Sequence, residues 1–395
     1  MNPISSQINL KVVNNTALPQ PVSILQIVPN SNSANNSNFL YEFNFTGQSY
    51  VGVTNVNAYI SNTSNPSIIA YNAPVLSQSI IGVVDALNSL NQGLFSYSGT
   101  TIYVSSNFYI YSNISISGSS IFGTTGINPQ EITIDSAGNI YTSNTSSSDV
   151  SKITPSGVST ILGTTGASPI GITIDGAGNI YTANNGNDTV SKITPLGVTT
   201  FFGVTGSNPT GITIDSAGNI YTTNNGGANV SKITPLGVST ILGTTGSFPI
   251  GITIDSAGNI YTANSGADNV SKITPLGVST ILGTTGSNPT GITIDSAGNI
   301  YTANNVSNNV SKITQLGVST ILGTTGNNPL GITIDSAGNI YTANNASFDV
   351  SKITPLGVST ILDITGAFPT GITIDNFNNI YTSNFGADNV TVIVQ

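Results

Sequence analysis

Seven aspartates recur at intervals of forty residues, and this regular set of carboxylates is the first candidate for chemistry in the sequence. They are Asp135, Asp175, Asp215, Asp255, Asp295, Asp335 and Asp375. A set of carboxylates suits calcium binding or acid–base catalysis. Each one, however, opens a short turn such as "DSAGN", where an Asp carboxylate accepts backbone N–H groups. The pattern therefore predicts a structural role for the seven, with metal binding or catalysis as the alternative.

Glu131 is an acidic residue that breaks the repeat, because the other six units carry Gly at its position. A metal site there needs several convergent carboxylate, Asn or His ligands, and the sequence supplies Glu131 with Asn neighbours but no matched acid. We therefore expect no catalytic residue, no cofactor and no metal, with Glu131 as the candidate ligand if a metal is bound.

The composition narrows the chemistry further. The chain has no Cys and no His, so thiolate chemistry is excluded and the commonest general base is missing. Its seven basic residues are all lysines, and the net charge is −9. Nucleic acid is therefore not an expected partner, because phosphate binding needs clustered Lys and Arg. Since no stretch approaches the roughly 18 apolar residues of a membrane span, membrane insertion is not expected either.

A repeat of forty residues positions these groups. The phrase "GITIDSAGNIYTAN" occurs unchanged at 251–264, 291–304 and 331–344, and each unit contains four short alternating segments typical of strands. Units of four strands and about forty residues are typical of propeller blades. The array ends 25 residues into its last unit, and 116–130 supplies the missing 15. This division predicts an all-β, seven-bladed β-propeller over 116–395, closed by an N-terminal outer strand paired with three C-terminal strands.

The motif "P-x-G-I-T-I-D-x-x-G-N-I-Y-T-A-N" resembles the NHL-type propeller repeat and is related in pattern to YVTN and lyase-type propellers. Where many NHL units have Asp, this chain has Asn144 and its equivalents. Where they often have Arg, it has Asp149 and its equivalents, so roles that need basic side chains, RNA binding included, are not expected. In the similar gluconolactonase-type enzymes a metal lies at the channel mouth, where this resemblance places Glu131.

The units differ from one another in two places: the loop between the second and third strands, and the link between units. In an up-and-down blade these two connections share one face, so we expect a variable face and, opposite it, a constant face. Variation on one face of a copied scaffold predicts a recognition surface, with neutral drift as the alternative. The recognition residues expected there are Asp188, Phe248, Asp268, Phe348, Phe368 and Phe385.

The first 115 residues lack the repeat and predict a separate, mainly-β anchoring or docking domain with one helix near 79–92. The segment resembles N-terminal modules of bacteriophage virion proteins. The chain also begins without the basic start and apolar run of a secretory signal, while its Asn, Ser and Thr suit an extracellular surface.

These observations predict a non-enzymatic virion protein of the spike, fibre or decoration type. Residues 1–115 would bind other virion or surface proteins, and the variable face would bind a host glycan or protein. A cell-surface adhesin or matrix protein, located outside the cell, is the alternative. A metal-dependent lactonase or lyase-type propeller enzyme is the third interpretation.

Overall fold

A computed structural model describes residues 118–395 without interruption, with side chains from Ser119, together with seven earlier strands. The chain divides into two compact units, residues 1–120 with 394–395 and residues 121–393. No helix of the described residues is both long and apolar enough to cross a membrane.

In the first unit the described residues form two antiparallel sheets. One has the order β1-β2-β6-β5 and the other β4-β3-β7. The strands are β1 (Gln26–Pro29), β2 (Leu40–Asn44), β3 (Val56–Asn62), β4 (Asn65–Ala73), β5 (Phe95–Ser98), β6 (Thr101–Ser105) and β7 (Phe108–Tyr111). The helix expected near 79–92 lies outside the described residues.

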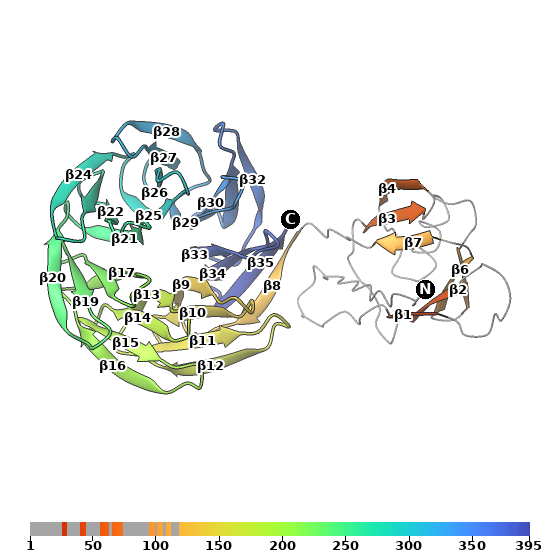
Figure 1. The fold of residues 1–395 in the computed structure, drawn as a ribbon, viewed down its shortest axis with the longest axis horizontal. Coiled ribbons are helices and arrows are strands. Elements are labelled where there is room, and N and C mark those ends of the chain that lie inside the picture. The colour runs from red at the N-terminus through yellow and green to blue at the C-terminus, as the bar shows by residue number, and fades with distance from the viewer. Residues whose placement is uncertain are drawn as a thin grey trace. The chain divides into compact units, whose positions relative to one another are not determined.

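The second unit is a seven-bladed β-propeller (Figure 1). Each blade is an antiparallel sheet of four strands, so the predicted all-β propeller is confirmed. The inner strands line the centre of the ring. They are β9 (Pro129–Ile134), β13 (Pro169–Ile174), β17 (Pro209–Ile214), β21 (Pro249–Ile254), β25 (Pro289–Ile294), β29 (Pro329–Ile334) and β33 (Pro369–Ile374).

The other strands repeat at the same spacing. The second strands are β10 (Ile140–Asn144), β14 (Ile180–Asn184), β18 (Ile220–Asn224), β22 (Ile260–Asn264), β26 (Ile300–Asn304), β30 (Ile340–Asn344) and β34 (Ile380–Asn384). The third strands are β11 (Asp149–Ile153), β15 (Thr189–Ile193), β19 (Asn229–Ile233), β23 (Asn269–Ile273), β27 (Asn309–Ile313), β31 (Asp349–Ile353) and β35 (Asn389–Val394). The outer strands are β8 (Gly118–Thr124), β12 (Ser159–Thr164), β16 (Thr199–Val204), β20 (Ser239–Thr244), β24 (Ser279–Thr284), β28 (Ser319–Thr324) and β32 (Ser359–Ile364).

The ring is closed as the arithmetic of the repeat predicts. Strand β8 pairs with β35 as the outer strand of blade 7, so both ends of the propeller sequence share one blade (Figure 1). Phe122 of β8 packs edge-on against Tyr381 of β34, with 5.0 Å between the ring centroids. Across the seam to blade 1, Thr370 Oγ1 donates to the Pro129 carbonyl at 3.1 Å.

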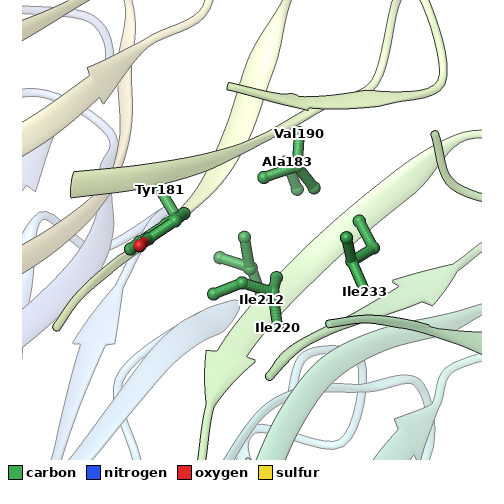
Figure 2. Packing of buried hydrophobic residues seen from close by; sticks show 6 residues of the cluster. All are labelled: Tyr181, Ala183, Val190, Ile212, Ile220 and Ile233. Carbon is green, nitrogen blue, oxygen red and sulfur yellow. The ribbon is translucent and has the colours of Figure 1, made fainter. Parts of the chain in front are cut away.

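The hydrophobic cores lie between neighbouring blades. In Figure 2, Tyr181, Ala183 and Val190 of blade 2 pack against Ile212, Ile220 and Ile233 of blade 3. Full burial of one such aliphatic side chain stabilises the fold by roughly 1.5–3 kcal/mol. Because every blade supplies half of two cores, the closed ring buries faces that an isolated blade would expose.

The constant face consists of the turns that join first to second and third to fourth strands, and its polar contacts recur in each complete unit. In blade 1, Asp135 Oδ1 accepts the N–H groups of Ala137 and Asn139 at 2.9 and 2.8 Å. Its Oδ2 accepts from Asn139 Nδ2 and from the Tyr141 hydroxyl, and Lys152 Nζ lies 5.7 Å from the centre of that Tyr ring.

This network bears out the structural role expected for the repeated aspartates. Burial alone would raise the pKa of Asp135, but the hydrogen bonds from Asn139, Tyr141 and Ala137 outweigh it and hold the pKa below its usual range. The repeated aspartates therefore use their carboxylates for hydrogen bonds within their own turns.

Candidate functional site

The variable face is built from seven pairs of hydrogen-bonded connections. In each blade the residue after the second strand donates its N–H to the link that precedes the inner strand. Examples are Thr145 to Asn128 and Ser265 to Phe248, both at 3.0 Å. The loops and links that vary between repeats therefore do share one face, as expected.

Two positions in every blade of this face have a left-handed backbone. The link position is occupied by Asn128, Ser168, Asn208, Phe248, Asn288, Asn328 and Phe368, and the loop position by Ser148, Asp188, Ala228, Asp268, Asn308, Phe348 and Asp388. Their φ values lie between 47° and 59°. Asn and Asp tolerate this region, whereas other side chains are strained there by roughly 1–2 kcal/mol. No glycine occupies these positions, so the sequence carries no signal for this conformation.

Asp188 and Asp268, two of the expected recognition residues, join neighbouring blades. Asp188 Oδ1 accepts the backbone N–H of Asn208, and Asp268 Oδ1 accepts that of Asn288, both at 2.7 Å. Equivalent bonds link Asn308 to Asn328 at 2.8 Å and Asp388 to Asn128 at 2.8 Å. We call this contact the interblade clasp. It gives the two aspartates a structural role on the face where recognition was expected.

The four expected phenylalanines lie in two groups. Phe348 and Phe368 form an edge-to-face pair across the seam between blades 6 and 7, with 5.0 Å between ring centroids and an interplanar angle of 85°. Phe385 belongs to the same group, since its N–H donates to the Phe368 carbonyl. Phe248 stands apart in blade 4 and is 57% exposed.

Glu131 lies on inner strand β9, within a β-bulge. Pro129 pairs with Asn144 and Ile132 with Thr142, so two residues of β9, Gln130 and Glu131, lie opposite the single Ser143. The Glu131 N–H donates to Ser143 Oγ at 3.3 Å. The same bulge recurs on the inner strand of every blade, so it belongs to the repeat and does not distinguish Glu131.

The neighbouring inner strand approaches Glu131 closely. A methyl group added at Gly371 of β33 would lie 2.9 Å from the Glu131 Cα, so no larger residue fits there without movement. Among the seven inner strands, Glu131 is the only residue with an ionisable side chain. The centre of the propeller therefore holds one titratable group.

Burial raises the pKa of Glu131 to about 7, although a hydrogen bond from the Ile132 N–H opposes the shift. The residue keeps partial exposure to solvent while the surrounding strands enclose its carboxyl group. A carboxyl group with this pKa exchanges protons readily at neutral pH, as a general acid or base must.

Among the residues it describes, the structure brings no cluster of acidic side chains to Glu131 that could hold a metal with it. Within the strands of the first unit and residues 118–395, no group of three or more His, Cys, Asp or Glu side chains is arranged to hold a metal ion. The structure thus places Glu131 as a single, partly exposed acid on the inner strands.

The Asn that replaces the Asp of NHL repeats has a defined structural role. Asn144 is fully buried; its Oδ1 accepts from the Thr142 hydroxyl at 2.9 Å. Its Nδ2 donates to Ser151 Oγ at 2.8 Å and to Asp149 Oδ1 at 2.6 Å. Asn144 and Asp149, the two positions where this chain departs from NHL repeats, are therefore in direct contact, and neither is basic. The same Asn recurs buried in every blade.

The fold is that of a seven-bladed β-propeller with one ionisable side chain, Glu131, on its inner strands. The family model of the virginiamycin B lyases matches residues 119–347. The chain belongs to the virginiamycin B lyase family, consistent with the lyase-type repeat expected from its motif.

Solved structures agree on the fold. A streptogramin B lyase is 19% identical, with a TM-score of 0.62 over 69% of this chain and 96% of its own. A catalytically inactive virginiamycin B lyase from Staphylococcus aureus, with one His replaced by Ala and solved with quinupristin, is 23% identical, with a TM-score of 0.62 over 69% and 96%. The WD40 propeller domain of Doa1 is 8% identical, with a TM-score of 0.60 over 71% and 97%. No curated protein matches the sequence.

The family corrects the expected function. A non-enzymatic virion protein was predicted, with an adhesin as the alternative, but the family model and its structural neighbours are those of lyases, which are enzymes. The prediction was wrong because it relied on composition and loop variation, neither of which distinguishes a binding face from a catalytic one. The location, the partners of residues 1–115 and the recognition residues stay predictions.

Proposed function

We propose that the propeller is a lyase that binds its substrate at the variable-face mouth of the central channel, with the Glu131 carboxylate as the general base. One observation carries this proposal: Glu131 is the only ionisable side chain on the seven inner strands. Its pKa of about 7 supports the role, because a base is most effective when its pKa lies near the working pH.

The reaction class follows from the family. A lyase breaks a bond by elimination. A base removes a proton from the carbon next to the bond that breaks, the C–H electron pair forms the new double bond, and the leaving group departs with its own electron pair. Here Glu131 accepts that proton as its carboxylate and then returns it from the acid form to the leaving group or to water.

The base cannot be a histidine in this chain. The Staphylococcus aureus enzyme is inactive when one His is replaced by Ala, so activity there depends on a histidine. This chain contains no His. A member of the family without histidine needs another proton acceptor, and Glu131 is the residue whose position and pKa suit the task.

The experiment follows consumption of quinupristin and virginiamycin B by purified full-length protein, using chromatography with mass detection. We expect the wild-type protein to convert at least one of them to product of the same total mass, since elimination adds no water. Glu131→Gln should lower the rate by a factor of roughly 10²–10⁴. The matched control Asp188→Asn changes an acid of the variable face outside the inner strands and should leave the rate unchanged.

The pH dependence gives a second readout. The wild-type rate should rise with pH through about 7, as Glu131 loses its proton. Full activity of Glu131→Gln would remove Glu131 from the mechanism. If wild-type protein leaves both compounds intact, these substrates are wrong.

A further inference from the structure

The seam between blades 6 and 7 differs from most other seams of the variable face. At four seams the interblade clasp joins the loop residue of one blade to the link residue of the next at 2.7–2.8 Å. At the 6–7 seam these two positions are Phe348 and Phe368, neither of which can form the clasp through its side chain. The seam has an aromatic pair in place of a hydrogen bond.

The exchange places two strained backbone positions at this seam. Phe348 and Phe368 have φ values of 58° and 55°, a region where Asn is strained far less than Phe. Both rings stay accessible, at 37% and 47% exposure. The Phe368 ring also occupies the space above Gly386, where an added methyl group would collide with its Cδ2 atom. Strained residues that expose apolar rings point to a ligand.

The charges around the seam are of one sign. Asp349 follows Phe348 directly, and Asp363 on outer strand β32 pairs with Val350 of the same blade. The lysines of residues 119–395 lie elsewhere, because each places its Nζ 5.4–5.7 Å from the centre of a Tyr ring whose hydroxyl contacts a constant-face aspartate. Asp349 Oδ1 accepts from Asn344 Nδ2 at 2.6 Å and Asp363 Oδ1 from the Ile364 N–H at 2.8 Å, so these charges act from within blade 6. Exposed phenyl rings near acidic residues suit a cation.

We propose that the Phe348–Phe368 pair binds an organic cation, such as a quaternary or protonated amine. The rings contact the apolar substituents and attract the charge through their electron-rich faces, and Asp349 and Asp363 add longer-range attraction. This site goes beyond the proposed function, because it needs binding and no turnover.

The test compares choline with its uncharged isostere 3,3-dimethyl-1-butanol by ligand-observed NMR titration of the full chain. We expect saturable binding of choline in the millimolar range, weakened by added salt, and at least tenfold weaker binding of the isostere. The double variant Phe348→Asn/Phe368→Asn copies the Asn308–Asn328 seam and should lose choline binding at least tenfold. Its melting temperature should not fall, because the copied seam restores the clasp.

Phe248→Asn is the matched control, since it removes an exposed, left-handed Phe from another seam without touching the pair. It should bind choline as the wild type does. Equal binding of choline and the isostere would overturn the proposal in favour of a purely apolar patch. Unchanged binding by the double variant would overturn it as well. Neither result bears on Glu131, whose test is turnover.

Discussion

The two faces of the propeller use different residues at their positive-φ positions. Each needs the chain to adopt positive φ twice per blade. The constant face uses Gly at these positions in every complete unit, for instance Gly218 and Gly237, with φ values of 80° and 78°. The variable face uses Asn, Asp, Ser, Ala and Phe there. Gly adopts positive φ without strain, and the constant face keeps Gly at these positions in every complete unit. On the variable face other residues adopt the same conformation with strain, and their side chains differ between blades.

The largest effect expected from this comparison concerns one aspartate from each face. Asp215 accepts four hydrogen bonds within its turn, from two backbone N–H groups, Asn219 Nδ2 and the Tyr221 hydroxyl. Asp188 accepts one N–H across a seam. We expect Asp215→Ala to lower the free energy of unfolding by about 3 kcal/mol and Asp188→Ala by about 1 kcal/mol.

Urea unfolding followed by circular dichroism measures both changes. Asp255→Ala is the control for the repeat, because its turn makes the same contacts in another blade and should cost the same. Equal losses for Asp215→Ala and Asp188→Ala would mean that the two faces do not differ in how their acids stabilise the ring.

The second prediction concerns how the stability of the fold depends on pH through Glu131 and through the aspartates of the constant face. Glu131 has a folded pKa of about 7, above its usual 4.5, so its contribution to stability is complete below pH 4.5 and is lost as pH rises through 7. The shift corresponds to a loss of at most about 3.5 kcal/mol, since each pKa unit is about 1.4 kcal/mol. The turn aspartates act oppositely: their pKa values are lowered, so their contribution is lost as pH falls below about 4.

Unfolding in urea at pH 5 and pH 8 tests the loss of stability expected as Glu131 ionises. Wild-type protein should be less stable at pH 8, and Glu131→Gln, which cannot ionise, should lose much less between the two values. A wild-type stability that is flat from pH 5 to pH 8 would show that Glu131 titrates near its usual pKa, and the proposed base would then be ionised throughout.

The propeller could be predicted from the sequence because its determinants are local and repeated. A unit contains its own strand alternation and turn residues, and the division of 15 and 25 residues specifies how β8 closes blade 7. The turn role of the aspartates could be predicted for the same reason, since donor and acceptor lie within six residues of each other.

The site depends on contacts that local patterns do not contain. Phe348 and Phe368 belong to neighbouring blades, and the raised pKa of Glu131 comes from burial in the folded ring, where Gly371 of blade 7 approaches it. The left-handed Phe positions carry no signal in single-sequence reasoning, where Phe favours strands. Loop variation predicts a functional face on the propeller, but the same variation suits a substrate site and an adhesive surface equally well.

The smallest expected effects come from substitutions at the positive-φ positions of the two faces. Gly258 on the constant face has a φ of 81° and open space apart from Pro275 Cγ at 3.3 Å, so Gly258→Ala tests the backbone alone and should cost about 1 kcal/mol. On the variable face, Phe248→Asn introduces the residue found at the same link position in two other blades, Asn208 and Asn288, with φ values of 54° and 59°. It should stabilise the protein by about 0.5 kcal/mol, since relief of strain is offset by loss of the ring contact over Gly266. Differential scanning calorimetry would resolve the opposite signs. A loss of stability in Phe248→Asn would mean that this exposed ring stabilises the fold, and the strain on the variable face would then need no functional explanation.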